Sequence, residues 1–126
     1  SGTKTGILAQ LAELDAQAEE RRSASIDNSA NAMKAVAESE RKIWENKLQS
    51  ILEILEQQLS GDEKTAFFTE QRSWVRDRES TAVANSKKQS GSMLEELEYI
   101  RSLRDLTRER VYALAEQYES ILDETE

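Results

Sequence analysis

The side chains that most often perform chemistry in proteins are partly missing from this chain. It contains neither cysteine nor histidine, which excludes the usual zinc ligand sets and most nucleophile–base pairs. The di-iron sites of helical bundles need a Glu-x-x-His motif on two helices, so they are excluded for the same reason. The sequence also has no glycine-rich loop of the phosphate-binding kind. We therefore predict a protein that is not an enzyme and that has no catalytic residue, metal or cofactor.

Carboxylates remain as candidates for acid–base or metal chemistry. Glu95, Glu96 and Glu98 form a small cluster. Paired carboxylates act as general acid and base only where their surroundings separate their pKa values. Acidic residues at the start of a helix are more commonly there because they interact favourably with the helix dipole. We prefer this structural interpretation of the cluster.

A second group of polar residues interrupts an apolar stripe. Gln71 and Arg78 lie in line with Trp74 at helical spacing, and Trp74 and Arg78 are four residues apart. A guanidinium at this spacing can lie over or beside the indole ring. Because an unpaired buried charge is costly, Arg78 needs a carboxylate partner. Glu45 and Glu79 are the candidates.

Thr107 and Arg110 interrupt another apolar stripe nearer the C-terminus. Two interpretations fit this pattern of interruptions. The polar residues can form a network between helices that sets their register, or they can form a patch that contacts a ligand. We favour the network.

The charge of the chain is strongly negative and unevenly placed. The formal net charge is −8, and five acidic residues with no basic residue follow Ala113. Such a charge disfavours nucleic acid and anionic membrane surfaces as partners. It would instead steer a basic protein toward the acidic segment. The candidate partner surface consists of Glu116, Glu119, Asp123 and Glu124.

The elements that must position these side chains are helices. The chain has no proline and only four glycines, and Ala, Leu, Glu, Gln, Lys and Arg are frequent. Gly61 and Gly91 stand in polar clusters that read as loops, and a softer break covers residues 23–29. The apolar spacing predicts helices over about 5–22, 29–59, 62–88 and 92–123.

Two local signals support the starts of the later helices. Ser60 or Asp62 can cap the third helix. Ser92 and Glu95 have the spacing of a capping box at the start of the fourth.

These helices predict an all-α fold. Short loops make consecutive helices antiparallel, so we expect a bundle of three long helices and a shorter N-terminal helix. We expect one domain over 1–126, with the N-terminal helix and soft break in 1–28 and the core in 29–126. No apolar run is long enough to cross a membrane.

Two runs of residues carry a resemblance to a known family. Residues 71–79 resemble its pattern Gln-Arg-x-Trp-x-x-x-Arg-Asp, and residues 106–110 resemble Leu-Thr-x-x-Arg. Residues 44–52 resemble its helix-2 motif more weakly. This is the LprI-like family of small exported bacterial helical domains, named for a lysozyme inhibitor. The resemblance covers about residues 30–118. Its motif residues here, which we expect to be structural, are Glu45, Leu48, Gln49, Gln71, Arg72, Trp74, Arg78, Glu79, Leu106, Thr107 and Arg110.

The chain departs from the family pattern in defined ways. The family's cysteines are absent, and Ala82 occupies one of their positions. Glu replaces Asp at positions 45 and 79, and Gln replaces Asn at 49. These changes keep the charge or the amide and add one methylene, which suits preserved pairing between helices.

The resemblance implies an exported protein-binding domain, periplasmic or secreted, with a basic lysozyme as the candidate partner. We find no signal-peptide pattern at the start of the chain, so export rests on the resemblance. The alternative is a structural or self-associating helical module of the cell envelope without lysozyme activity, because long amphipathic helices commonly pair. The sequence leaves the oligomeric state open.

Overall fold

The protein is an all-helical bundle in a computed structural model that describes residues 5–125. The described residues form five helices and no strand: α1 (Ile7–Ala24), α2 (Ala30–Gln58), α3 (Gly61–Lys87), α4 (Glu95–Gln117) and α5 (Glu119–Thr125). The predicted all-α fold is confirmed. Among the described residues, no helix is both long and apolar enough to cross a membrane.

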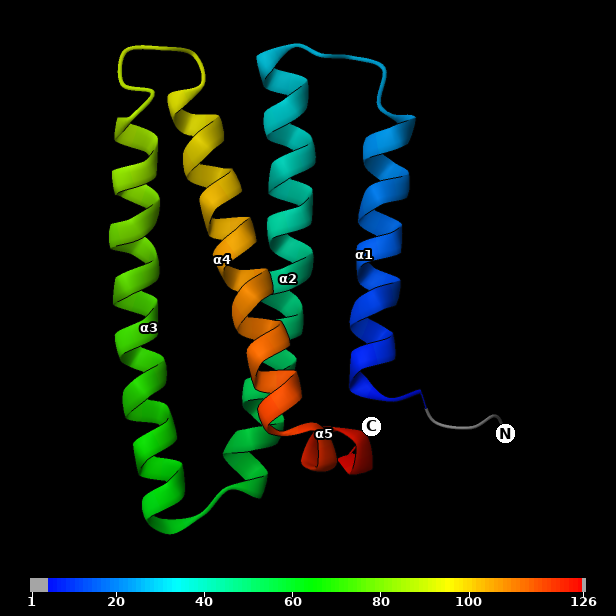
Figure 1. The fold of residues 1–126 in the computed structure, drawn as a ribbon, viewed down its shortest axis with the longest axis vertical. Coiled ribbons are helices and arrows are strands. Elements are labelled where there is room, and N and C mark those ends of the chain that lie inside the picture. Colours follow the sequence, from blue (N-terminus) through cyan, green and yellow to red (C-terminus); the bar gives the residue numbers. More distant parts are fainter. Residues whose placement is uncertain (1–4, 126) are drawn as a thin grey trace.

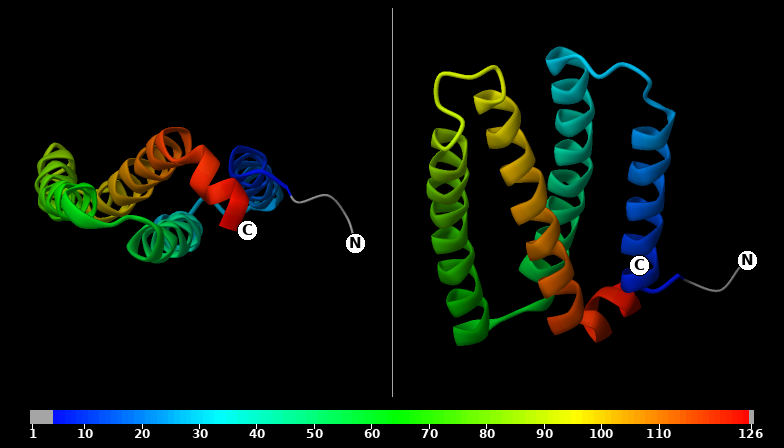
Figure 2. Two further views of the ribbon diagram at one scale, coloured as in Figure 1. Left: turned by 90° about the horizontal axis from the view of Figure 1, so that it is seen from below. Right: turned by 45° about the horizontal axis from the view of Figure 1, so that its top comes forward.

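The four long helices alternate in direction along the chain (Figure 1). α4 lies between α2 and α3 and packs against both, while α1 contacts α2, α4 and α5 at the other edge. Seen from below, the helices therefore form a staggered row in the order α3, α4, α2, α1 (Figure 2). The most extensive contact joins α2 and α4, which run in the same direction (Figure 1).

The predicted loops lie between the long helices. Gly61 and Gly91 have φ angles of 58° and 81°, a region that favours glycine because other residues meet a steric penalty there. The start of α2 is capped by Ser29, whose hydroxyl accepts a hydrogen bond from the Ala32 amide at 3.2 Å. Ser60 occupies the N-cap position of α3, but its side chain makes no capping bond.

The prediction of one continuous fourth helix over 92–123 is wrong. α4 begins at Glu95 and ends at Gln117, and α5 follows after a break at Tyr118. The break turns α5 back toward α1, so that Leu122 becomes fully buried in the core. Burial of this leucine favours the bent over the straight path because apolar area leaves water.

The predicted capping box of Ser92 and Glu95 is also wrong. The Ser92 hydroxyl accepts from the Leu94 amide at 3.1 Å, and the Glu95 carboxylate accepts from the Gly91 amide at 3.3 Å. Both side chains thus bond within the turn before the helix. The N-cap residue of α4 is Leu94, which has no side-chain capping bond.

The core runs along the seam between α2 and α4 and is closed at one end by α1 and α5. Its buried members are Ile7, Leu11, Trp44, Leu48, Ile51, Leu55, Leu59, Phe67, Val111, Leu114, Ala115 and Leu122. Trp44 is 1% exposed, whereas Trp74 is only partly buried against this cluster. Ile7 and Leu11 belong to α1, so this helix docks on the bundle.

Candidate functional site

Arg78 joins three helices through one guanidinium nitrogen. Its Nη1 donates to Glu45 Oε1 of α2 at 3.2 Å and to Thr107 Oγ1 of α4 at 3.1 Å. Glu45 also accepts from Arg41 on its own helix. Of the two carboxylates expected near Arg78, Glu45 therefore makes the pair. Glu79 instead accepts a hydrogen bond from the Tyr99 hydroxyl at 2.7 Å.

Trp74 lies between two arginines. The guanidinium carbon of Arg78 is 5.0 Å from its ring centroid, and that of Arg110 is 5.6 Å away. Arg110 is held in place because its Nε donates to Gln71 Oε1 at 2.9 Å and its Nη1 to Glu70 Oε1 at 3.0 Å. The residues predicted to interrupt the apolar stripes thus meet at the α3–α4 interface.

The other family-motif residues divide by exposure. Leu48, Gln71 and Thr107 are buried, and Leu106 is half-buried. Gln49, Arg72 and Glu79 are exposed, and Gln49 and Arg72 bond to neighbours on their own helices. Most of the motif therefore makes contacts between helices and leaves few polar atoms free to meet a ligand.

A second polar cluster, not predicted from the sequence, joins α1 to α4. Arg108 donates from Nε and Nη2 to the two oxygens of Asp15, at 2.7 and 2.8 Å. The Tyr112 hydroxyl also donates to Asp15. The hydrogen bond from Arg108 is the main reason that the pKa of Asp15 is lowered, and the Tyr112 bond acts in the same direction. Burial, followed by the bond to Asp15, raises the pKa of Tyr112.

A third cluster surrounds Glu40, which is 3% exposed. Arg22 of α1 and Arg104 of α4 approach its carboxylate at 3.5 and 3.7 Å. Glu40 was not predicted from the sequence either. The available signal was its position four residues before Trp44, on the stripe that α2 turns inward.

Three of the four residues predicted to form an acidic partner surface are exposed. These are Glu116, Glu119 and Glu124. Asp123 is only partly exposed, and its Oδ1 accepts a hydrogen bond from the Ile7 amide at 2.7 Å. It thereby satisfies an amide at the start of α1 that has no partner within the helix.

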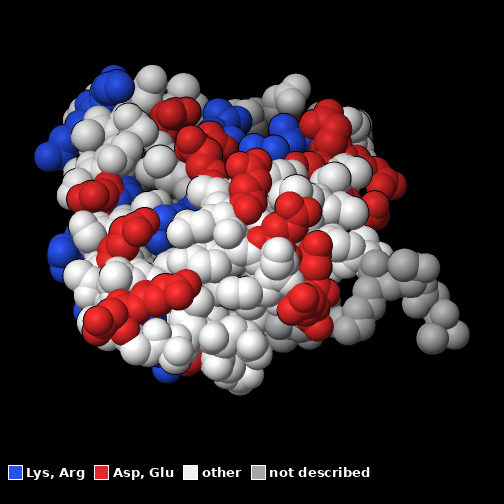
Figure 3. Space-filling model, turned by 60° about the horizontal axis from the view of Figure 1, so that its bottom comes forward, with Lys and Arg blue, Asp and Glu red and all other residues white. Residues whose placement is uncertain are grey.

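Carboxylates of a neighbouring helix extend the acidic end of the bundle. Burial raises the pKa of Tyr118, and the charges of Glu63 and Glu70 on α3 raise it further. Figure 3 shows this end of the molecule, with acidic side chains spread from left to right across the face and basic ones mainly at the left edge and toward the top. The bottom of the bundle thus presents mostly negative charge.

The Glu95, Glu96 and Glu98 cluster has structural partners. Glu96 pairs with Lys34 at 3.0 Å and Glu98 with Arg101 at 3.8 Å, while Glu95 accepts from the Gly91 amide. Within residues 5–125, no group of three acidic, histidine or cysteine side chains could hold a metal ion. The two ion pairs and the bond to Gly91 are contacts of the kind expected of acids with a structural role.

A family model described as "Lysozyme inhibitor LprI" matches residues 10–114. The chain belongs to the LprI family. The LprI match begins within α1 and so extends further toward the N-terminus than the resemblance over 30–118. No curated protein and no solved structure matches the chain.

Proposed function

We propose that this LprI-family domain is an exported, non-enzymatic protein that binds a basic lysozyme through its acidic end. The family description names lysozyme inhibition. The observation that carries the proposal is the exposure of Glu116, Glu119 and Glu124 at the C-terminal end of the bundle. Complementary charge speeds encounter and suits a basic enzyme surface.

Negative charge is concentrated at the C-terminal end of the chain, where the proposed lysozyme-binding surface lies. No lysine or arginine follows Arg110, so α5 and the end of α4 have no basic residue of their own. Charges that lack intramolecular partners are cheaper to present to another protein, because no existing ion pair has to be broken. Among the family-motif residues, Arg78 and Arg110 already bind Glu45 and Gln71 within the bundle.

The test is a titration of the domain into a basic c-type lysozyme, with cell-wall lysis and heat of binding read at two salt concentrations. We expect inhibition that weakens as salt rises, because screening shortens the range of the attraction. The variant Glu116→Gln/Glu119→Gln should bind about tenfold more weakly at low salt, about 1.4 kcal/mol.

A matched control removes two exposed acids elsewhere on the bundle. Glu20→Gln/Asp77→Asn changes the net charge equally, on α1 and α3. It should bind lysozyme nearly as well as the parent chain. Equal losses in both variants would point to net charge alone, and an absence of inhibition by the parent chain would overturn the proposal.

One observation favours a second candidate function, self-association. Ile26 is 95% exposed and Met93 is 80% exposed. They lie in the α1–α2 and α3–α4 connections, which are at the same end of the bundle (Figure 1). Light scattering over a range of concentrations tests this candidate, and a monomer at every concentration would dispose of it.

A further inference from the structure

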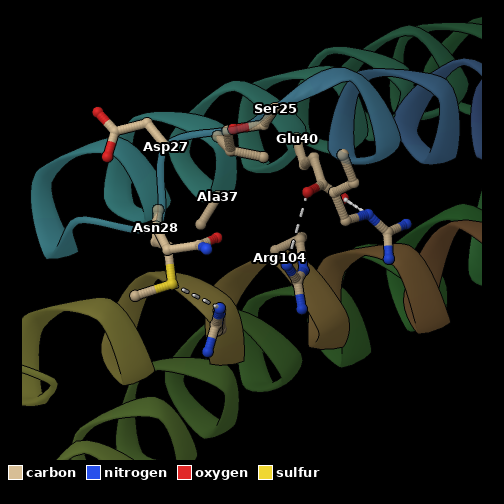
Figure 4. Close-up of a pocket in the computed structure, with 10 residues that line it drawn as sticks. Ser25, Asp27, Asn28, Ala37, Glu40 and Arg104 are labelled. Carbon is tan, nitrogen blue, oxygen red and sulfur yellow. Dashed lines mark hydrogen bonds and ion pairs between the residues drawn. The ribbon is translucent and has the colours of Figure 1, made fainter.

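A cavity lies where the α1–α2 connection crosses α2 and α4 (Figure 4). Its volume is about 130 Å³, and Asp27, Ala37, Glu40 and Arg104 are among the residues that line it. A volume of this order far exceeds the need of one water molecule and is close to that of a cavity known to hold benzene. The cavity can therefore hold a small organic molecule.

Glu40 supplies an unsatisfied acceptor to this cavity. Its Oε1 has no hydrogen-bond partner within the described chain, although the Arg104 Nη1 atom is 3.7 Å away. The Arg22 Nε atom is 3.5 Å from the other oxygen. Both distances exceed those of charge-assisted hydrogen bonds. Because a buried acceptor without a donor is costly, a ligand donor at Oε1 would be favoured.

Two arginines of α4 supply donors on the same cavity wall. Arg101 contacts the sulfur of Met33 at 4.0 Å and lies 3.8 Å from Glu98, so its contacts are weak. Arg104 uses its Nε on Asp105 at 2.8 Å and turns Nη1 toward Glu40. Guanidinium N–H groups with such contacts can bind a carboxylate, often with two parallel bonds.

The charges on the wall select the class of ligand. A simple anion would be attracted by Arg22, Arg101 and Arg104 but repelled by Asp27 and the buried Glu40, and a simple cation would meet the reverse. A zwitterion satisfies both. Met33, Val36 and Ala37 form an apolar part of the lining, which suits a short hydrocarbon side chain.

We propose that this cavity binds a free α-amino acid with a small apolar side chain. Its ammonium group donates to Glu40, its carboxylate accepts from Arg101 and Arg104, and its side chain packs against Met33 and Val36. The cavity is distant from the acidic end formed by α5, since it lies at the α1–α2 connection (Figure 1). The proposed amino-acid site and the proposed lysozyme-binding surface are therefore separate places on the bundle, and each can be tested without the other.

The experiment is calorimetric titration of the full chain with L-leucine, N-acetyl-L-leucine and L-leucinamide. The second compound lacks the ammonium and the third lacks the carboxylate. We expect L-leucine to bind with submillimolar affinity and each derivative to bind at least about tenfold more weakly. Glu40→Gln and Arg101→Gln should each weaken L-leucine binding by at least about tenfold.

Controls separate binding from folding. Glu53→Gln removes an exposed carboxylate from the same helix and should leave L-leucine binding unchanged. Thermal unfolding by circular dichroism checks that each variant folds. If Glu40→Gln does not fold, the binding result for Arg101→Gln, at a more exposed residue, decides. The proposal is overturned if L-leucine at about 10 mM gives no heat, if N-acetyl-L-leucine or inorganic phosphate binds equally well, or if Arg101→Gln binds L-leucine like the parent.

Discussion

The two tryptophans contact arginine in different surroundings. Trp44 is enclosed by the core, and Arg108 lies 5.7 Å from its ring centroid. Trp74 is half-buried and lies between the guanidinium groups of Arg78 and Arg110. The same residue type therefore stabilises the fold mainly by burial in one place and partly by cation–π contact in the other.

Truncation of these side chains should separate the two contributions. Trp44→Ala should lower the free energy of unfolding by about 3–5 kcal/mol, because a large buried ring leaves a cavity. Trp74→Ala should cost less, about 1–3 kcal/mol, since part of its surface is already in water. Urea denaturation measures both values. A larger loss at Trp74 would contradict the burial found here.

The Arg78 bond to Thr107 gives a second prediction at this scale. Arg78→Met should cost about 1–2 kcal/mol, because Thr107 is fully buried and loses its donor. Glu45 keeps Arg41 as a partner, which limits the cost. Adding Thr107→Val should recover part of the loss, since both polar partners are then removed together. Strictly additive losses in a double-mutant cycle would contradict this account.

Polar contacts attach α1 to the bundle along its whole length. Its first amide bonds to Asp123 of α5, its middle is fastened by Asp15 to Arg108, and Arg22 near its end faces Glu40. Its buried apolar residues are Ile7, Leu11 and Ala18. The docking of α1 should therefore respond to pH more than the seam between α2 and α4 does.

Acid should weaken the α1 contact through Asp15. The Arg108 hydrogen bond holds the pKa of Asp15 below its ordinary value, so the unfolded chain binds a proton at higher pH than the folded one. The contribution to stability is thus complete above about pH 4, the unfolded value, and is lost as pH falls through the folded pKa.

Asp15→Asn tests this pH dependence. It should cost about 0.5–1 kcal/mol at pH 7, the size expected for a partly exposed ion pair. It should also make the fall in stability below about pH 4 shallower than in the parent chain. Urea denaturation at a series of pH values gives both quantities. Parallel curves for the two proteins would show that Asp15 does not contribute to acid sensitivity.

At the scale of the whole molecule, charge is distributed unequally between the ends of the bundle. The net charge is −8, and exposed carboxylates without a basic neighbour in sequence follow Arg110. Like charges held together oppose the compact state and also attract a basic partner. Stability and binding therefore place opposite demands on these residues.

Glu116→Gln/Glu119→Gln should show both effects. Thermal unfolding at low salt should reveal unchanged or slightly higher stability, by up to about 0.5 kcal/mol, because repulsion is relieved. Added salt should remove this difference through screening. A clear loss of stability would mean that these two carboxylates have partners within the fold.

The all-α fold, the glycine loops and the packing of Arg78 on Trp74 were predictable from sequence, because each depends on residues a few positions apart. Helix propensity, loop chemistry and the four-residue spacing are local properties. The choice of Glu45 over Glu79 was not predictable in this way. It depends on how α2, α3 and α4 meet.

Tertiary structure alone decided that α4 lies between α2 and α3, that α5 bends away, and that Asp123 caps α1. The Asp15–Arg108 pair and the Glu40 cavity were likewise decided by the tertiary structure alone. Asp15 and Arg108 are 93 residues apart, and no periodicity relates such distant positions. Burial of Leu122 outweighs continuation of the helix, and this preference arises only when α1, α2 and α4 are already in place.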